Sequence, residues 1–164
     1  MTGANAVLVI DAIRQVVTNT IPILGNPTGI AITPDGKSAY IPNGPQILVL
    51  DTDPDSPTFQ TFVDTITVGA GLVTNVAISP EGTFAYVVDE GEGTVLKIRT
   101  RTRQIEARIS VGPNRPAGIG ITRGGGRIFV VNHDADSVSV IERGTNTVTT
   151  TIQVGRAPLG VAAR

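Results

Sequence analysis

The sequence predicts an all-β fold built from repeated antiparallel sheets of four strands, and three observations support this prediction. The first is a repeat of about 43 residues, each copy of which ends in a glycine. The second is a composition with 19 Gly and 11 Pro around short runs of Val, Ile and Thr. The third is that no stretch between the turn signals keeps the i, i+3, i+4 apolar spacing of a helix.

The first strand of each repeat follows the glycine that ends the previous copy. The copies end in TIPILG, TITVG, RISVG and TIQVG, at Gly25, Gly69, Gly112 and Gly155. A loop and then an alternating apolar segment follow each glycine, at 28–33, 74–79, 117–122 and 159–163. Because period-2 alternation is typical of a strand, we expect a strand at each of these positions.

The remaining strands follow in a fixed order. The turns PDG (34–36), PEG (80–82) and RGGG (123–126) come next, where Pro fixes φ and Gly supplies positive φ. We expect second strands at 39–43, 85–89 and 128–132, and third strands at 7–11, 47–51, 95–99 and 138–142. The glycine-ended segments are the fourth strands. Four short antiparallel strands in about 43 residues are typical of a β-propeller blade.

These repeats predict one β-propeller domain over 1–164 with about four blades. Three blades are complete, over 28–68, 74–110 and 117–153. The last is split between the termini, over 158–164 and 5–24, and lacks its second strand. Three arrangements remain open: a ring of four blades with one damaged, two chains that form an eight-bladed ring head to tail, and a piece of a longer propeller.

The first strands also predict how the blades stack. One face of each is bulky, as at Ile30 and Ile32, and the other is small, as at Gly29 and Ala31. We expect the bulky residues of one blade to fill the space beside the small residues of the next. The other bulky pairs are Val76 and Ile78, Ile119 and Ile121, and Val161 and Ala163.

The linked motifs PDG, AYIPN, ILVLDT and TITVG resemble the YVTN-type β-propeller repeat, and the resemblance covers essentially the whole chain. The third copy departs most, with RGGG in place of PDG and IRTR (98–101) at the end of its third strand. The resemblance implies a propeller fold. It also implies a secreted or cell-envelope protein, since such repeats occur in surface-layer proteins, periplasmic binding proteins and lactonase-like enzymes.

Composition and charge exclude several classes of function. The formal net charge of −1 gives no overall field that attracts nucleic acid or an anionic membrane. The absence of Cys excludes disulfides, thiolate metal sites and cysteine nucleophiles. The N-terminus shows no basic segment followed by an apolar stretch, so no signal peptide is visible, and the apolar runs are too short to span a bilayer.

A ligand site is expected at one mouth of the propeller channel. The loops before each first strand and between the second and third strands would build this mouth. An alternative is that Asn and Asp there only cap backbone amides in turns. The same loops contain Asn26, Thr28, Glu92 and Asp136. The predicted ligand-binding residues are Asn43, Asp89, Glu90, Asn114, Arg115, Asn132, His133, Asp134 and Arg156.

Two acidic segments have partial metal signatures. His133, Asp134 and Asp136 offer an imidazole and two carboxylates for a divalent metal or for a general base, although all three lie in one turn. No other cofactor is predicted. The segment 51–55 has the D-x-D-x-D spacing of calcium loops, but Ser56 and Phe62 replace the Gly and Glu of an EF-hand. We interpret it as an inserted hairpin loop.

A basic stripe lies in the third repeat. Its residues are Lys97, Arg99, Arg101, Arg103 and Arg108. One interpretation is a phosphate or nucleic-acid patch, but no aromatic residue is interleaved for base stacking. A solvated outer edge, paired with the acidic insert of the neighbouring blade, is favoured.

The favoured function is therefore a non-catalytic scaffold that binds a protein or a small ligand at the channel mouth. The alternatives are a lactonase-like or metal-assisted hydrolytic enzyme and a DNA-binding propeller. The sequence holds neither G-x-S-x-G nor H-E-x-x-H, and no catalytic residue is assigned. The expected partners are a protein or small molecule and a second copy bound head to tail, with nucleic acid disfavoured and no membrane span.

Overall fold

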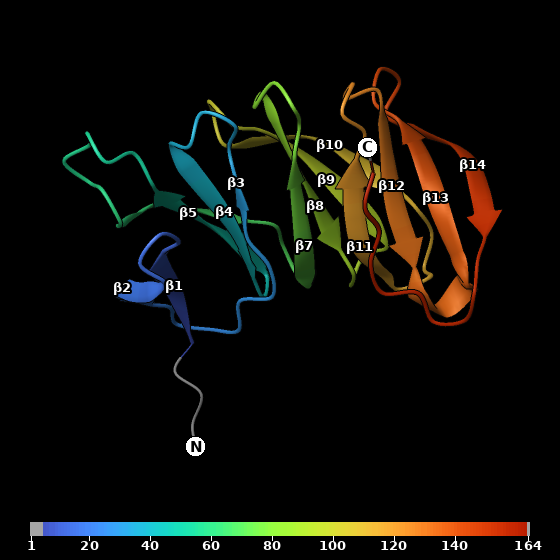
Figure 1. Cartoon of the computed structure of the whole chain (residues 1–164). Helices are drawn as coiled ribbons and strands as arrows, with labels where there is room; N and C mark the ends of the chain where they lie inside the picture. Colours follow the sequence, from blue (N-terminus) through green and yellow to red (C-terminus); the bar gives the residue numbers. More distant parts are fainter. Residues whose placement is uncertain (1–4, 164) are drawn as a thin grey trace.

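The computed structural model describes residues 5–163, which form an open array of antiparallel sheets (Figure 1). Residues 1–4 and Arg164, the last residue of the predicted split blade, lie outside the described range. Residues 5–163 contain three sheets of four strands, one sheet of two strands and no α-helix. No helix in this range is long and apolar enough to cross a membrane. The predicted all-β array of antiparallel blades is therefore confirmed.

Each complete blade has its four strands side by side in chain order. The first blade consists of β3 (Ala31–Ile32), β4 (Ser38–Asn43), β5 (Gln46–Asp51) and β6 (Phe62–Thr67). The second consists of β7 (Val73–Ile78), β8 (Phe84–Asp89), β9 (Thr94–Arg99) and β10 (Gln104–Ser110). The third consists of β11 (Pro116–Ile121), β12 (Arg127–Asn132), β13 (Ser137–Glu142) and β14 (Thr147–Gln153), with one 3-10 turn, η1 (His133–Ala135), between β12 and β13. The two-stranded sheet is β1 (Ala6–Asp11) and β2 (Val16–Pro22).

Two predicted first strands differ from the structure. The strand expected over 28–33 is reduced to β3, because Pro42 on the facing strand has no N–H to donate into the ladder. The segment 159–163 forms no strand, since no second strand pairs with it among the described residues. It nevertheless lies against β11, where a Cβ added to Gly118 would be 2.7 Å from the carbonyl oxygen of Leu159.

The two halves of the predicted split blade lie at opposite ends of the array (Figure 1). The hairpin β1–β2 packs on the first blade, where Val7, Val9 and Ile21 contact the cluster that contains Ala39 and Ile41. The C-terminal segment lies beside the third blade instead. The sheets of residues 5–163 do not close into a ring, so these residues do not form the ring of four blades that the repeat count allowed.

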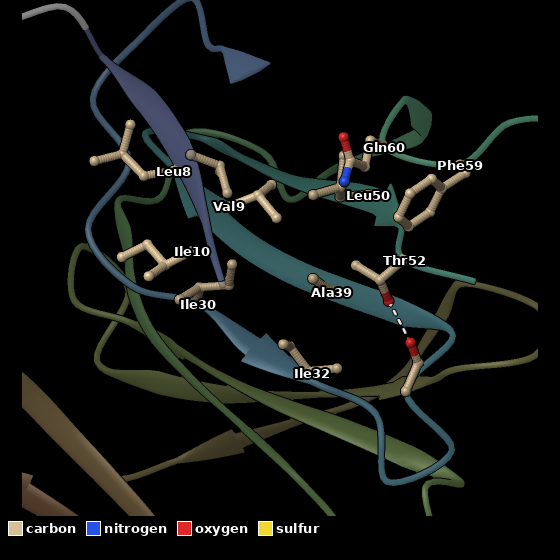
Figure 2. Close-up of a pocket in the computed structure, with 12 residues that line it drawn as sticks. Leu8, Val9, Ile10, Ile30, Ile32, Ala39, Leu50, Thr52, Phe59 and Gln60 are labelled. Carbon is tan, nitrogen blue, oxygen red and sulfur yellow. Dashed lines mark hydrogen bonds between the residues drawn. The ribbon is translucent and has the colours of Figure 1, made fainter. Parts of the chain in front are cut away.

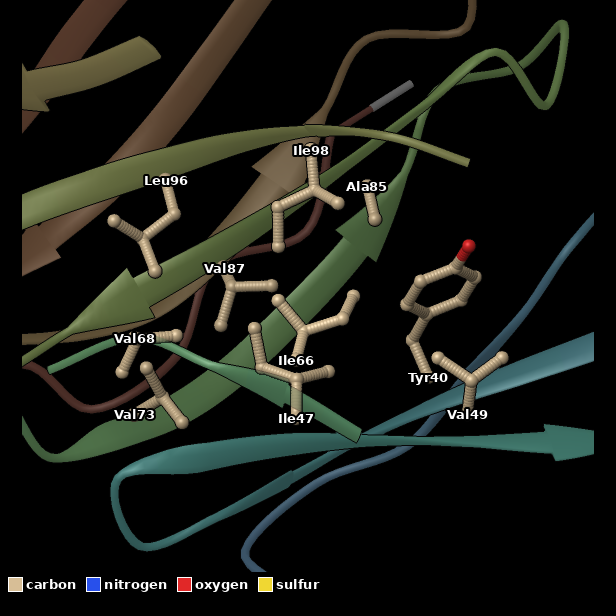
Figure 3. Packing of buried hydrophobic residues seen from close by; sticks show 10 residues of the cluster. All are labelled: Tyr40, Ile47, Val49, Ile66, Val68, Val73, Ala85, Val87, Leu96 and Ile98. Atoms are coloured by element: carbon tan, nitrogen blue, oxygen red, sulfur yellow. The ribbon is translucent and has the colours of Figure 1, made fainter. Parts of the chain in front are cut away.

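The core lies between the blades. Figure 3 shows Tyr40, Ile47 and Val49 of the first blade facing Val87 and Ile98 of the second. A second cluster joins the second and third blades in the same way. Burying each Val, Leu or Ile side chain contributes about 1.5–3 kcal/mol. Each blade is a separate sheet, so these side chains, with a backbone hydrogen bond between the first and second blades, hold the array together.

The bulky and small faces of the first strands meet as predicted. Val76 and Ile78 on β7 pack against the cluster shared with the first blade. A Cβ on Gly29 would lie 3.3 Å from the carbonyl oxygen of Thr74, so the small face of the first blade touches β7 directly. Ile119 and Ile121 on β11 pack against the second blade in the same sense.

Candidate functional site

The two sets of loops predicted to form the channel mouth lie together at one edge of the blades. In the second blade, the Glu90 N–H donates to the carbonyl of Leu72 over 2.8 Å. In the third blade, the His133 N–H donates to the carbonyl of Arg115 over 3.2 Å. These backbone bonds tie the loop after the second strand to the loop before the first strand, so residues from both loops share one rim.

A cavity of about 210 Å3 opens at this rim, between the second and third blades. Three of the predicted ligand-binding residues, Glu90, Arg115 and His133, line it. Sequence reasoning missed Asn75, whose signal was a polar residue at the position where the other first strands have Gly29, Gly118 and Gly160. The remaining lining residues are Thr74, Ala117 and Leu159.

Polar contacts hold the side chains of the cavity in place. The Arg115 Nε donates to the Glu90 Oε1 over 2.8 Å, and this bond between two blades raises the pKa of Arg115. Arg115 has a φ of 49°, a left-handed conformation that few residues other than Gly adopt. His133 Nδ1 lies 2.6 Å from Asp134 Oδ1, which leaves Nε2 as the nitrogen not engaged with that carboxylate. The wall thus offers hydrogen-bond donors and acceptors in fixed positions.

Other predicted ligand-binding residues lie on the rim without lining the cavity. Asn114 contributes its backbone carbonyl, which accepts from the Asp134 N–H over 3.2 Å. Asp134 and Arg156 are exposed to solvent. None of the three is among the residues that line the cavity.

The predicted residues Asn43, Asp89 and Asn132 occupy equivalent positions at the ends of the second strands, and all three are buried. Asn43 donates to the carbonyl of Leu24 over 2.9 Å, and Asp89 accepts from the Glu92 N–H over 3.2 Å. Such bonds are those of turn caps, the alternative role considered for these residues. Asn132 donates to the hydroxyls of Ser137 and Ser139.

The predicted metal ligands are not assembled into a site. Among residues 5–163, no group of three or more His, Asp or Glu side chains is placed to hold a metal ion. His133 and Asp134 contact each other, while the carboxylate of Asp136 accepts from the Ala157 N–H over 2.8 Å. The three side chains lie on one short turn, which is why they do not surround a common point.

The basic stripe is engaged in contacts within the protein. Arg99 forms an ion pair with Glu106, and Arg103 lies 3.4 Å from Asp64 of the first blade. Lys97 and Arg99 also stack over the Phe84 ring, with their cationic groups 4.3 and 4.8 Å from its centre. The stripe therefore reaches the neighbouring blade through Asp64 on β6 and not through the acidic insert, whose Asp53 pairs with Lys37 of its own blade.

Comparisons with known proteins identify the fold. No model of a known protein family matches the chain, and no curated protein matches its sequence. Hydrazine synthase from Kuenenia stuttgartiensis superposes with a TM-score of 0.81 at 24% identity, over 90% of this chain and 43% of that one. A functionally unknown protein from Desulfotomaculum acetoxidans gives 0.74 at 19% identity, over 88% of this chain and 48% of that one.

The RRP9 WD40 repeats give a TM-score of 0.73 at 17% identity, over 87% of this chain and 44% of that one. WD40 repeats are propeller blades. The chain spans less than half the length of these solved structures. At these identities the likeness shows the fold alone, and the chain therefore has the architecture of β-propeller blades.

Proposed function

We propose that this chain is a non-catalytic β-propeller scaffold that binds a partner at the channel mouth. The observation that supports this most is the convergence of Glu90, Arg115 and His133, from two blades, on one cavity. The cavity volume of about 210 Å3 is below the roughly 300–1,000 Å3 of pockets that enclose drug-sized ligands. A single side chain of a protein partner fits such a volume, so a protein is the favoured ligand.

The chemistry of the wall favours a polar side chain that both donates and accepts hydrogen bonds. The opposite charges of Arg115 and Glu90 offset each other at the mouth. Asn75 adds an amide with both donors and an acceptor. An Asn or Gln side chain on a partner loop matches this set better than an isolated charge does, since burial of an unpaired charge is costly.

A library of random displayed peptides tests the proposal. Peptides selected on the unmodified protein should bind at least about tenfold more weakly to Arg115→Ala and His133→Ala, which corresponds to about 1.4 kcal/mol. Arg101→Ala is the matched control, since Arg101 is an exposed cation on the hairpin between β9 and β10. Selected peptides that bind all three variants equally would place the binding surface elsewhere.

The hydrolytic alternative has its own test. We expect no stoichiometric metal in the purified protein and no turnover of a panel of simple lactones. A metal bound at one per chain and lost in both His133→Ala and Asp134→Ala would contradict a non-catalytic scaffold. Lactone hydrolysis that is lost in His133→Ala would contradict it as well.

We also propose that two copies associate head to tail. The sheets of residues 5–163 leave both ends of the array open, and the chain covers 43% and 44% of two solved structures that it resembles. A particle mass of two chains in light scattering is the expected result. A single-chain mass at about 100 μM would contradict this association.

A further inference from the structure

An apolar cleft lies at the N-terminal end of the array, between β1 and the strand segment that contains β3. Its volume is about 450 Å3, and none of its lining residues is charged. Figure 2 shows Leu8 and Ile10 of β1 on one side of the cleft and Ile30 and Ile32 on the other. The other lining residues are Val7, Val9, Gly36, Ala39, Leu50, Thr52, Phe59 and Gln60.

The repeat shows what these positions normally contact. Leu8 and Ile10 are 53% and 60% exposed, whereas the equivalent residues of the second blade, Leu96 and Ile98, are both 0% exposed. Leu96 and Ile98 are buried against the face of the first blade that carries Ile47 and Val49. Leu8 and Ile10 therefore occupy blade-interface positions that no neighbouring blade covers within residues 5–163.

The first strand of the first blade also exposes side chains whose equivalents in the second blade contact a preceding blade. Ile30 and Ile32 are 51% and 55% exposed. Their equivalents in the second blade, Val76 and Ile78, pack against the blade before them. Between the first and second blades, this bulky side of β7 lies against the small face of the preceding first strand, at Gly29.

The opposite end of the array presents the matching small face. The segment 158–163 lies on β11 through one side, where a Cβ on Gly120 would be 3.3 Å from the carbonyl oxygen of Val161. On its other side, Gly160 and Ala162 are exposed, and a Cβ on Gly160 would meet nothing within 4 Å. This side corresponds to the Gly29 side of the first blade.

The outer strands at that end are exposed in the same pattern. Ile152 and Val154 are 47% and 41% exposed, while their equivalents Ile109 and Val111 are 3% and 7% exposed. Ile109 and Val111 are covered by the third blade, in a cluster that includes Ile141. In the repeat, Ile10 of β1 holds the position of Ile141. Ile10 is therefore the side chain that would cover an outer-strand segment such as the one with Ile152 and Val154.

We propose that these two ends are the two halves of one interface between copies of this chain. The segment 158–163 of a second copy enters the cleft and lays Gly160 and Ala162 against Ile30 and Ile32. Ile152 and Val154 of that copy then cover Leu8 and Ile10. The contact continues the interface already present between the blades, which is why a second copy is the occupant. This inference rests on the head-to-tail association proposed above and names the surfaces that form it.

The contact is heterologous, because the two copies contribute different surfaces. Two such contacts close a ring of two copies if the rotation between them allows it. The split blade of each copy is then completed from the other copy, apart from its second strand. The same strand edges, left open, would otherwise invite irregular pairing.

Substitution on each side of the interface provides the first test. Gly160→Leu fills the small face, and Ile30→Asp places a charge in the cleft, so each should weaken dimerisation at least about tenfold in sedimentation equilibrium. Gly124→Leu and Ile13→Asp are matched controls, since Gly124 has open space around it and Ile13 is 95% exposed on the β1–β2 turn. A dimer that either interface variant leaves intact would overturn the proposal.

Cross-linking between copies provides the second test, because the chain has no Cys of its own. Oxidation of a mixture of the single variants Ile32→Cys and Ala162→Cys should give a covalent dimer that contains one copy of each. A mixture of Ala12→Cys and Ala162→Cys is the control, since Ala12 lies on the exposed turn after β1. No covalent dimer in the first mixture, or equal yields in both, would overturn the proposal.

Peptide binding separates this inference from the mouth site. If Gly160→Leu is monomeric and still binds the peptides that Arg115→Ala loses, the interface is confirmed independently of the mouth. If Gly160→Leu remains dimeric, the interface is wrong, whatever the peptides do.

Discussion

At the scale of single residues, Asp89 shows how a repeat position selects its side chain. It is 0% exposed, and its nearest cationic group is on Arg108, 3.8 Å away. The equivalent positions of the other blades hold Asn43 and Asn132. A buried carboxylate costs more to desolvate than an amide, and an ion pair recovers this cost only when its geometry is good.

We therefore expect Asp89→Asn to be as stable as the unmodified protein or more stable, by up to about 1 kcal/mol. The amide oxygen of Asn can accept from the Glu92 N–H as the carboxylate does, and Asn43 shows that an amide is accommodated at the equivalent position, where it donates to the carbonyl of Leu24. Asp89→Ala should lose about 2 kcal/mol, since it removes the acceptor of the Glu92 N–H. Urea denaturation at pH 7 measures both. A loss greater than about 1 kcal/mol in Asp89→Asn would show that the Arg108 pair stabilises the fold.

Asp51 predicts a pH dependence of stability. Hydrogen bonds from the hydroxyls of Ser56 and Thr58, each 2.5 Å, and from the Asp53 N–H lower the pKa of Asp51. A carboxylate whose pKa is lower in the folded state stabilises the fold above its unfolded pKa of about 3.9. That stabilisation is lost as the pH falls from about 4 through the folded pKa.

Asp51→Asn should therefore be less stable than the unmodified protein at pH 7 and should approach it in stability below about pH 3. Urea denaturation at pH 7, 5 and 3 tests this expectation. A stability difference between the two proteins that stays constant over this range would contradict it.

Only part of the mouth could be predicted from the sequence. Glu90, Arg115 and His133 follow from the position of their loops in the repeat. The burial of Asp89 could not be predicted, because Asn and Asp in turns look the same whether they cap the backbone or face a ligand. Its burial depends on Gly71, where a Cβ would come within 2.3 Å of the Asp89 carboxylate.

At the scale of elements, most strands could be predicted because their pattern is local. Alternation and turn residues placed β8 and β9 within one residue of their observed bounds. The prediction was wrong for 159–163, where strand formation requires a partner strand that the pattern of the segment does not reveal. Pairing is a property of two segments, so it is less predictable than alternation within one.

The C-terminal segment depends on glycine at position 118. A Cβ there would lie 2.7 Å from the carbonyl oxygen of Leu159, with backbone rather than a flexible side chain in the way. Gly118→Val should therefore displace 159–163 from β11. Trypsin cleavage after Arg156 should become at least about tenfold faster, because exposed backbone is cut preferentially.

Gly124→Val is the control for this change, since a Cβ at Gly124 meets nothing within 4 Å. Mass spectrometry of the released peptide identifies the cleavage site. Equal cleavage rates in Gly118→Val and the unmodified protein would mean that the segment does not rely on this close approach.

At the scale of the whole molecule, the repeat count predicted a split blade, but it did not predict where the halves lie. Val7 and Val9 of β1 pack against the first blade. The C-terminal segment lies against the third blade, where Gly118 allows its backbone to approach closely. Each half is held by its nearest neighbour in sequence, as expected for a repeat array in which each unit contacts only adjacent units. Closure is a long-range property, so local patterns do not determine it.

If the exposed ends pair between copies, stability must depend on protein concentration, because association favours the folded state by mass action. Above the dissociation constant, each tenfold rise in concentration stabilises a dimer by about 1.4 kcal/mol, or about 0.7 kcal/mol per chain. At about 2–4 °C per kcal/mol for a chain of this size, the Tm should rise by about 2 °C for each tenfold step. Gly160→Leu should abolish this dependence, while Gly124→Leu should retain it. Calorimetry from about 5 to 500 μM measures the slope, and a Tm of the unmodified protein that does not change over this range would contradict the association of the two ends.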